Sequence, residues 1–341
     1  MSDSLNSRLN NITEKFSSSK YPYLPKKNLL IEVTNSCNCN CIFCANNKMT
    51  RRRNFIDEKI VYRLLKEAYD LGVREVGFYT TGEPLLNPKL EEYITYAKKL
   101  GYIYTYITTN GILLNDKRIK SLVNSCVDSI KISINAINKE DYKFIHGVDK
   151  FEVVMNNLKN LYNYRKENNS KYKIFVSYVA TKYTDIDINE IKNFFKDYCD
   201  EVGIINVRNQ SGMMPEICNF SCENGKNKIK SERNIPCHYV FNTINVTCEG
   251  YLSACCTDFQ NYLVYADLNK VSLKEAWHNE IITELREKHL HNKIDNTLCY
   301  NCIHSNKEMP NPLLKDLASK FNGICEDDKI LDRIKKYRKE D

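Results

Sequence analysis

Short apolar runs recur along the first two thirds of the chain, and amphipathic segments separate them. The apolar runs predict strands at 29–33, 75–80, 102–108, 129–134, 174–181 and 204–207. The amphipathic segments predict helices near 57–71, 88–100, 115–125, 151–167 and 187–198. Because strands and helices alternate, we expect a parallel sheet with helices on its outside.

The pattern changes after residue 235. The segment "VTCEGYLSACC" predicts a hairpin that turns at Glu249–Gly250, and "SLKEAWHNEIITELRE" predicts one helix. Ser272 is the expected N-cap of that helix, with Glu275 at the capping-box spacing. The expected organisation is therefore a polar N-terminal extension (1–27), an α/β core (28–210), a linker or lid (211–235), a small α+β domain (236–305) and a C-terminal tail (306–341).

Composition narrows the function classes. The net charge of +7 is modest for 341 residues, and no nucleic-acid-binding motif accompanies the basic runs, so we expect no nucleic-acid partner. The chain has no long apolar stretch and no signal-peptide pattern, which predicts a cytoplasmic protein without a membrane partner. In a reducing compartment, 15 cysteines with clustered spacing favour metal ligation over disulfides.

Three of these cysteines form a compact motif directly after the first predicted strand. Cys37, Cys41 and Cys44 have the spacing C-x3-C-x2-C within "NSCNCNCIFCANN". Thiolates hold iron–sulfur clusters, and three of them leave one iron of a four-iron cube open to another ligand. The alternatives are a structural zinc site or three reduced core cysteines, and the spacing fits zinc poorly. Cys39, a fourth thiol inside the loop, is not expected to be a ligand.

The motif and its context resemble the radical S-adenosylmethionine (radical SAM) superfamily over about 28–210. "TTGEP" (80–84) follows the second predicted strand, "TTNG" (108–111) ends the third, and "KISINA" (131–136) ends the fourth. The resemblance implies a partial (β/α)6 TIM-like barrel with these segments at the C-terminal ends of its strands. It also implies that SAM binds the open iron of a [4Fe–4S] cluster and is cleaved to methionine and a 5′-deoxyadenosyl radical.

The resemblance further implies contacts to SAM. Residues expected to contribute are Phe43 near the adenine, Thr81, Gly82, Glu83 and Pro84 at the amino group, Thr109, Asn110, Ser133 and Asn135 along the pocket, and Arg208 at the SAM carboxylate or the substrate. The alternative for these segments is an ordinary turn or strand end, and for Arg208 a surface position.

The second cysteine region resembles the SPASM/Twitch extension of radical SAM enzymes. Cys237, Gly250 and Cys255 fit its opening, and "CYNC" supplies Cys299 and Cys302. The further cysteines of a full SPASM domain are replaced by Glu308 and Pro312. The resemblance therefore implies one auxiliary [4Fe–4S] cluster held by Cys237, Cys255, Cys299 and Cys302. A zinc site on the same thiolates is the alternative, and Cys256 could replace Cys255.

Together these features predict a radical SAM oxidoreductase with two [4Fe–4S] clusters. The radical would abstract a substrate hydrogen, the auxiliary cluster would accept an electron, and an external donor of flavodoxin or ferredoxin type would reduce the first cluster. Asp258 is a candidate base, with an exposed turn residue as the alternative. The expected substrate is a small polar metabolite such as a sugar, aminosugar or cyclitol alcohol. A peptide- or protein-modifying maturase, a redox-neutral epimerase and a non-catalytic iron–sulfur or zinc protein are the alternatives.

Overall fold

The structure is a computed structural model. It describes residues 29–184, 186–214, 217, 220, 235–304, 306 and 308–320. The expected N-terminal extension, most of the expected lid and the end of the expected tail lie outside the described residues.

Six strands and the helices between them form the first part of the fold. In chain order these are β1 (Leu29–Ile31), α2 (Glu58–Asp70), β2 (Glu75–Gly77), α3 (Leu90–Leu100), β3 (Tyr104–Thr109), α4 (Asp116–Asn124), β4 (Ser129–Ser133), α5 (Lys139–His146), α6 (Phe151–Glu167), β5 (Lys173–Ala180), α7 (Ile188–Phe195) and β6 (Glu201–Asn206). Short 3-10 turns η1 (Ala45–Asn47), η2 (Pro84–Leu86) and η3 (Gln210–Gly212) lie in the loops. The expected alternation of strands and helices is confirmed.

The second part is smaller. It contains α8 (His238–Asn242), β7 (Ile244–Val246), β8 (Tyr251–Ser253), β9 (Val264–Asp267), α9 (Leu273–Trp277), α10 (Glu280–Leu290) and α11 (Leu298–His304). β7 and β8 pair antiparallel, and Gly250 in the turn between them has a φ of 82°. The predicted hairpin and its glycine are therefore confirmed.

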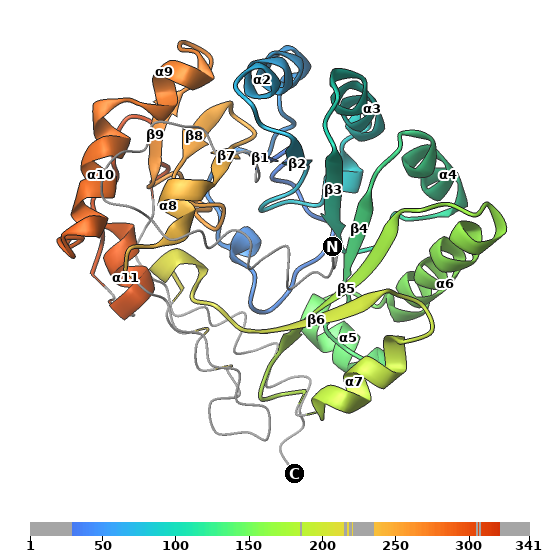
Figure 1. Ribbon diagram of the computed structural model, residues 1–341. Helices are drawn as coiled ribbons and strands as arrows, with labels where there is room; N and C mark the ends of the chain where they lie inside the picture. The colour runs from blue at the N-terminus through green and yellow to red at the C-terminus, as the bar shows by residue number, and fades with distance from the viewer. Residues whose placement is uncertain are drawn as a thin grey trace.

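One sheet runs through both parts, in the order β6-β5-β4-β3-β2-β1-β7-β8-β9. Strands β1 to β6 are parallel, and β7 joins the open edge of β1, also in parallel. In Figure 1 the strands form an open arc, and helices α2, α3, α4, α6, α9 and α10 lie along its outer side. The expected partial barrel followed by a small α+β unit is confirmed, with the addition that the second unit extends the sheet of the first.

Burial explains why the sequence forms this arc. Along β3, Thr105, Ile107 and Thr109 are buried while the alternate residues are only half-buried. Successive side chains of a strand point to opposite faces, so the buried set packs under the helices. Helix α2 covers this face with an apolar stripe of Val61, Leu64, Leu65 and Ala68, which are fully buried. The opposite, half-buried set of β3 lines the inside of the barrel.

Two local features differ from the sequence prediction. The helix expected from "SLKEAWHNEIITELRE" is two helices, because the Asn279 side chain accepts a hydrogen bond from Ile282 N (3.0 Å) and starts α10. Ser272 and Glu275 form the predicted capping box on α9. Helix α5 was not predicted, although Asn138 caps its start and Gly147 ends it with a φ of 67°.

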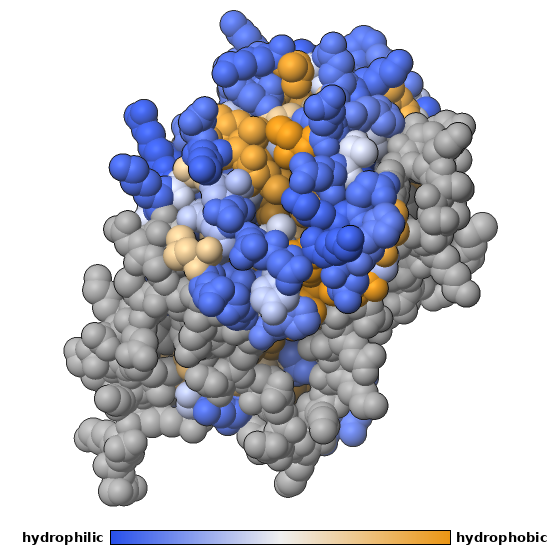
Figure 2. Space-filling view, turned by 90° about the vertical axis from the view of Figure 1, so that its left-hand side faces the viewer, coloured by the Kyte–Doolittle hydropathy of each residue, from blue (hydrophilic) through white to orange (hydrophobic). Residues whose placement is uncertain are grey.

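Figure 2 shows the face of the molecule on the side of α9 and α10. Hydrophilic residues cover most of the coloured surface, and apolar residues show in a band between them. None of the helices in the described ranges has both the length and the apolar character needed to cross a membrane.

Candidate iron–sulfur and SAM sites

The loop after β1 carries the first three cysteines, and helix α5 holds its middle. Asn40 N donates to His146 O (2.9 Å) and Ile42 N donates to Ile145 O (2.9 Å). Cys44 caps η1, with its sulfur accepting from Asn46 N at 3.4 Å. The cysteines predicted as ligands are half-buried, so their sulfurs combine a fixed backbone with partial access.

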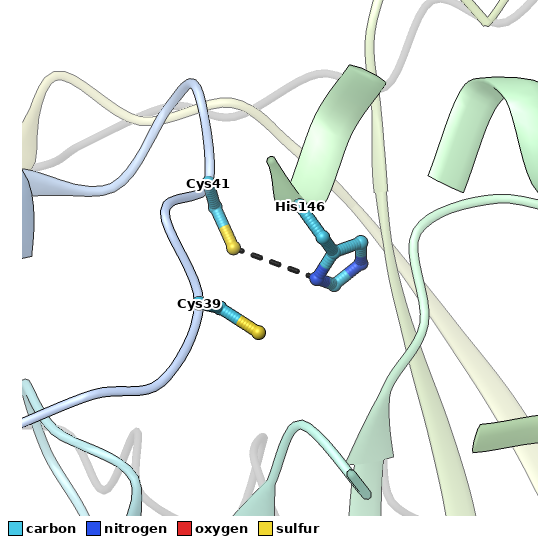
Figure 3. A group of neighbouring side chains, drawn as sticks. All are labelled: Cys39, Cys41 and His146. Carbon is cyan, nitrogen blue, oxygen red and sulfur yellow. Dashed lines mark hydrogen bonds between the residues drawn. The ribbon is translucent and has the colours of Figure 1, made fainter. Parts of the chain in front are cut away.

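His146 lies beside this loop and was missed by the sequence analysis. Its Nδ1 is 3.5 Å from the sulfur of Cys41, and Figure 3 shows the ring pointing at that thiol from α5. The ring is buried, stacks on Tyr142 with centroids 4.1 Å apart, and places Nε2 at 2.7 Å from Ile134 O. These contacts fix the ring orientation, so His146 positions Cys41.

Cys39 lies beside Cys41 in the same loop and is buried (Figure 3). A hydrogen bond from the Cys39 thiol lowers the pKa of Cys37, and the same hydrogen bond, with a second one to Cys41, raises the pKa of Cys39. The Cys39 thiol is thus the hydrogen-bond donor to its two neighbours. Its exclusion from the ligand set stays a prediction.

The "TTGEP" segment packs directly on the cysteine loop at Gly82. A Cβ at this position would lie 2.3 Å from Thr34 O and 2.6 Å from Ser36 O, so only glycine fits. Glu83 N donates to Ser36 O at 2.8 Å. Asn46 Nδ2 donates to Thr81 O at 3.2 Å, which ties the loop from its other side.

The Glu83 carboxylate is buried and holds the "TTNG" segment. It accepts hydrogen bonds from Thr109 Oγ1 (2.6 Å), Asn110 N (2.7 Å) and Leu85 N (3.0 Å). Burial raises the pKa of Glu83 against these hydrogen bonds. A carboxylate has about four acceptor positions, so roughly one is left for a ligand. Pro84 follows as the first residue of η2.

The side-chain amides of Asn110 and Asn135 differ in how far contacts within the protein use their hydrogen-bonding groups. Asn110 Nδ2 donates to Asn38 Oδ1 (2.7 Å) and lies 3.9 Å from Cys37 Sγ, at the edge of the cysteine loop. The Asn135 amide accepts from Val179 N (2.8 Å) and has its Nδ2 3.2 Å from His146 Nε2. Its backbone is left-handed, with a φ of 53°. The structure therefore accounts for the Asn135 side chain by contacts within the protein.

The remaining SAM candidates surround the same end of the barrel. Ser133 is half-buried at the end of β4, opposite Ser177 of β5. The backbone carbonyl of Phe43 accepts from Gln210 Nε2 at 3.1 Å, and its ring is partly buried against the core. Arg208 follows β6 and is exposed.

The second set of cysteines comes from three elements. Cys237 precedes α8, Cys255 follows β8, and Cys299 and Cys302 lie one turn apart on α11. Gly212 of η3 lies against α11, since a Cβ there would be 2.3 Å from Cys302 N. The fold therefore brings segments separated by more than sixty residues into one region.

Cys255 has the chemistry of a metal ligand. Hydrogen bonds from Cys256, Ser211 and Thr257 lower its pKa to about 5, in that order, although burial opposes them. Ser211 Oγ and Thr257 Oγ1 lie 3.4 Å and 3.3 Å from its sulfur. Cys256 has its pKa raised by the same contact, so Cys255 is the better thiolate of the two.

Two groups in the described ranges bring three possible ligand atoms within 4.8 Å of one another. These are Cys39, Cys41 and His146, and Glu32, Cys248 and Glu249. Neither group is one of the two predicted ligand sets. Both predicted sets fit an iron–sulfur cluster by donor type, because thiolates are its usual protein ligands, and their ligand roles stay predictions.

Asp258 is not an exposed turn residue, because it is only 4% exposed. Its carboxylate accepts from Leu263 N (2.7 Å), Tyr262 N (3.0 Å) and Ser253 Oγ (3.2 Å). Burial raises its pKa to about 6. These contacts close the turn between β8 and β9, and a role for Asp258 as a base stays a prediction.

The barrel and its two thiolate-rich regions define an iron–sulfur protein of the α/β class. Comparison with family models places it more closely: residues 31–195 match the radical SAM superfamily, and residues 237–303 match SPASM, an iron–sulfur cluster-binding domain. The chain is a member of the radical SAM superfamily with a C-terminal SPASM domain. Its cofactors are accordingly SAM, a [4Fe–4S] cluster and an additional iron–sulfur cluster in the SPASM domain.

Curated relatives match part of the chain. An uncharacterized protein of Methanocaldococcus jannaschii is 31% identical over 179 residues, which cover 52% of this chain and 56% of that protein. A probable GTP 3′,8-cyclase of Saccharolobus islandicus is 35% identical over 135 residues, which cover 40% of this chain and 43% of that protein. The chain thus spans about half the length of the curated relatives it matches.

Solved structures share the fold across most of the chain. SuiB of Streptococcus suis bound to precursor peptide SuiA has a TM-score of 0.63 at 17% identity, covering 89% of this chain and 76% of SuiB. BtrN in complex with AdoMet and 2-DOIA has a TM-score of 0.55 at 18% identity, covering 82% and 92%. At these identities the likeness concerns the fold alone.

Proposed function

We propose that this protein is a radical SAM oxidoreductase that oxidises a carbon of a small polar substrate. The observation that carries the proposal is that the two cysteine regions lie close together. Gln210 joins them, because it lies beside Ser211 at the second region and donates to Phe43 O in the first. A substrate inside the barrel would have a radical source and an electron acceptor within one site.

At the first region, Cys37, Cys41 and Cys44 would hold a [4Fe–4S] cluster. With SAM bound, the open iron of this cluster supplies a 5′-deoxyadenosyl radical for abstraction of a substrate hydrogen. The protein supplies position: His146 orients Cys41, and Gly82 lets the SAM-binding segment approach the cysteine loop. Glu83 holds the third-strand loop and keeps one acceptor position for the SAM amino group.

At the second region, Cys237, Cys255, Cys299 and Cys302 would use every iron of an auxiliary [4Fe–4S] cluster. Such a cluster would accept the electron left on the substrate radical after hydrogen abstraction, while the hydroxyl proton would pass to a base, either water or a protein carboxylate. It would have no open position for SAM. The hydroxyls of Ser211 and Thr257 beside Cys255 would tune its potential. An external donor of flavodoxin or ferredoxin type would reduce the first cluster.

The proposed substrate is a sugar, aminosugar or cyclitol alcohol. The half-buried side of the barrel strands carries hydroxyl and amine side chains, which suit a small polar molecule. BtrN with 2-DOIA, among the structural neighbours, agrees with this substrate class. A peptide substrate is the second candidate, favoured by the likeness to SuiB bound to a precursor peptide.

The test uses anaerobically reconstituted protein with SAM and dithionite. It should form 5′-deoxyadenosine slowly alone and faster with a matching alcohol from a panel of sugars, aminosugars and cyclitols. An alcohol deuterated at its carbinol carbon should pass deuterium to 5′-deoxyadenosine and give a product two hydrogens lighter. Cys41→Ala is the control and should form none.

Different outcomes separate the alternatives. Stimulation by peptides alone would move the substrate class to peptides, and a product of unchanged mass would indicate epimerisation. Iron-replete wild-type protein that forms no 5′-deoxyadenosine would contradict the proposal as a whole.

A further inference from the structure

Lys131 of β4 is a cation that the sequence motifs do not explain. It lies on the half-buried, inward face of the strand, on the same side as Ser133. Within the described part of the chain, it forms no ion pair, and its nearest ring is Tyr79, 5.5 Å from Nζ to the centroid. An unpaired cation in a partly desolvated site is costly unless an opposite charge arrives.

Burial lowers the pKa of Lys131 to about 8, which leaves the amine mostly protonated near neutral pH. The site therefore keeps a positive charge.

One further group faces the same space. Thr108 lies opposite Lys131 in the β3–β4 register, and its Oγ1 is buried with no hydrogen-bond partner among the described residues. A hydroxyl that can donate a hydrogen bond thus lies beside the amine of Lys131.

We propose that Lys131, with Thr108 beside it, binds an anionic oxygen group of the substrate inside the barrel. The group is a carboxylate or a phosphate, since both accept hydrogen bonds from an ammonium and a hydroxyl. This inference rests on the proposed function and adds to it that the polar substrate is negatively charged.

The test measures anion binding and needs no turnover. Reconstituted, SAM-loaded protein is titrated calorimetrically with pyrophosphate and, separately, with malonate at low ionic strength. We expect at least one anion to bind, with Lys131→Met weakening it about tenfold or more, as for loss of a charged hydrogen bond, and Lys131→Arg restoring most of it. The anion that binds more tightly shows whether the bound group of the substrate is a phosphate or a carboxylate.

The matched control is Lys173→Met. Lys173 is half-buried at the N-terminal end of the neighbouring strand β5, and it pairs in register with Ser129, two residues before Lys131. This variant should bind the anion as the wild type does.

Two results would overturn the proposal. One is wild-type protein that binds neither anion although it cleaves SAM, which leaves the proposed oxidoreductase function standing. The other is equal affinity in Lys131→Met and wild type, with a changed potential of the auxiliary cluster. That result would assign the lysine to balancing cluster charge.

Discussion

The two cysteine regions are built in different ways. The first has three cysteines within residues 37–44, all on one loop that follows β1. The second collects its four cysteines from positions 237 to 302, at the start of α8, after β8 and on α11. A local motif fixes its own spacing, whereas a dispersed one depends on the whole fold. The second region is therefore the more sensitive to packing.

A buried ion-pair network next to the first cysteine loop also connects the two regions. Arg51 is 1% exposed at its side chain and binds Glu32 of the loop after β1 and Glu249 of the hairpin turn, with Nε 2.8 Å from Glu249 Oε1. Glu32 also accepts from Cys248 N at 2.9 Å. This buried ion pair fixes the hairpin against the cysteine loop, so breaking it should disturb both regions at once.

Arg51→Met should produce the largest loss of stability. It leaves the Glu32 carboxylate buried without its cation, which costs about 3–5 kcal/mol of unfolding free energy. Urea denaturation of reconstituted protein, followed by circular dichroism without oxygen, measures this loss. Lys288→Met removes an exposed pair with Glu284 on α10 and should cost only about 0.5 kcal/mol.

The Arg51–Glu32 ion pair also predicts how the stability of the fold depends on pH. Burial alone would raise the pKa of Glu32, but the Arg51 charge and hydrogen bonds outweigh it and lower that pKa below 4.5. A carboxylate whose pKa is lower in the folded state stabilises the fold above its unfolded pKa, and this stabilisation is lost as pH falls. The wild type should therefore lose more stability on acidification below about pH 4.5 than Arg51→Met does. Parallel pH curves for the two proteins would show that the pair contributes little.

Gly82→Ala should destabilise the fold less than Arg51→Met does, and it should slow SAM cleavage at the first cysteine region. The added methyl would meet Thr34 O and Ser36 O, so the two loops must separate, at a cost of about 1–3 kcal/mol. SAM cleavage should fall by roughly 10²-fold, as expected when reacting groups move by about 1 Å. The iron of the second region should be retained.

Gly72→Ala provides the matched control. Gly72 has a φ of 97°, and no atom lies within 4 Å of the position that a Cβ would take, so its substitution strains the backbone by about 1 kcal/mol without a collision. Its SAM cleavage should equal that of wild type. An equal loss in both variants would mean that close loop packing at Gly82 has no special role.

Sequence patterns predicted most of the fold because its periodicity is strong. The helix at 151–167 was predicted with the bounds that α6 has, and each predicted barrel strand is present. Helix α5 was missed because its short apolar pattern is weak, although Asn138 and Gly147 are recognisable cap residues. Strand β6 starts at Glu201, before the apolar run that predicted it, because pairing with β5 extends it.

The site was predictable where chemistry is local and less so where the fold brings it together. The spacing of the first cysteines is visible in the chain, but the contact of His146 with Cys41 spans 105 residues. Lys131 lies in the segment "KISINA" but has no predicted role, because only the barrel shows which side of the strand faces inward. Asp258 could be judged only from its buried hydrogen bonds.

The most direct test of the account is the response of each cluster to SAM. Electron paramagnetic resonance of the reduced protein should give two cluster signals, of which SAM changes one, because only the first region leaves an iron open. Cys299→Ala/Cys302→Ala should keep the SAM-sensitive signal, and Cys41→Ala should lose it while retaining the other. A SAM-sensitive signal that survives in Cys41→Ala and disappears in Cys299→Ala/Cys302→Ala would contradict the assignment of the two regions.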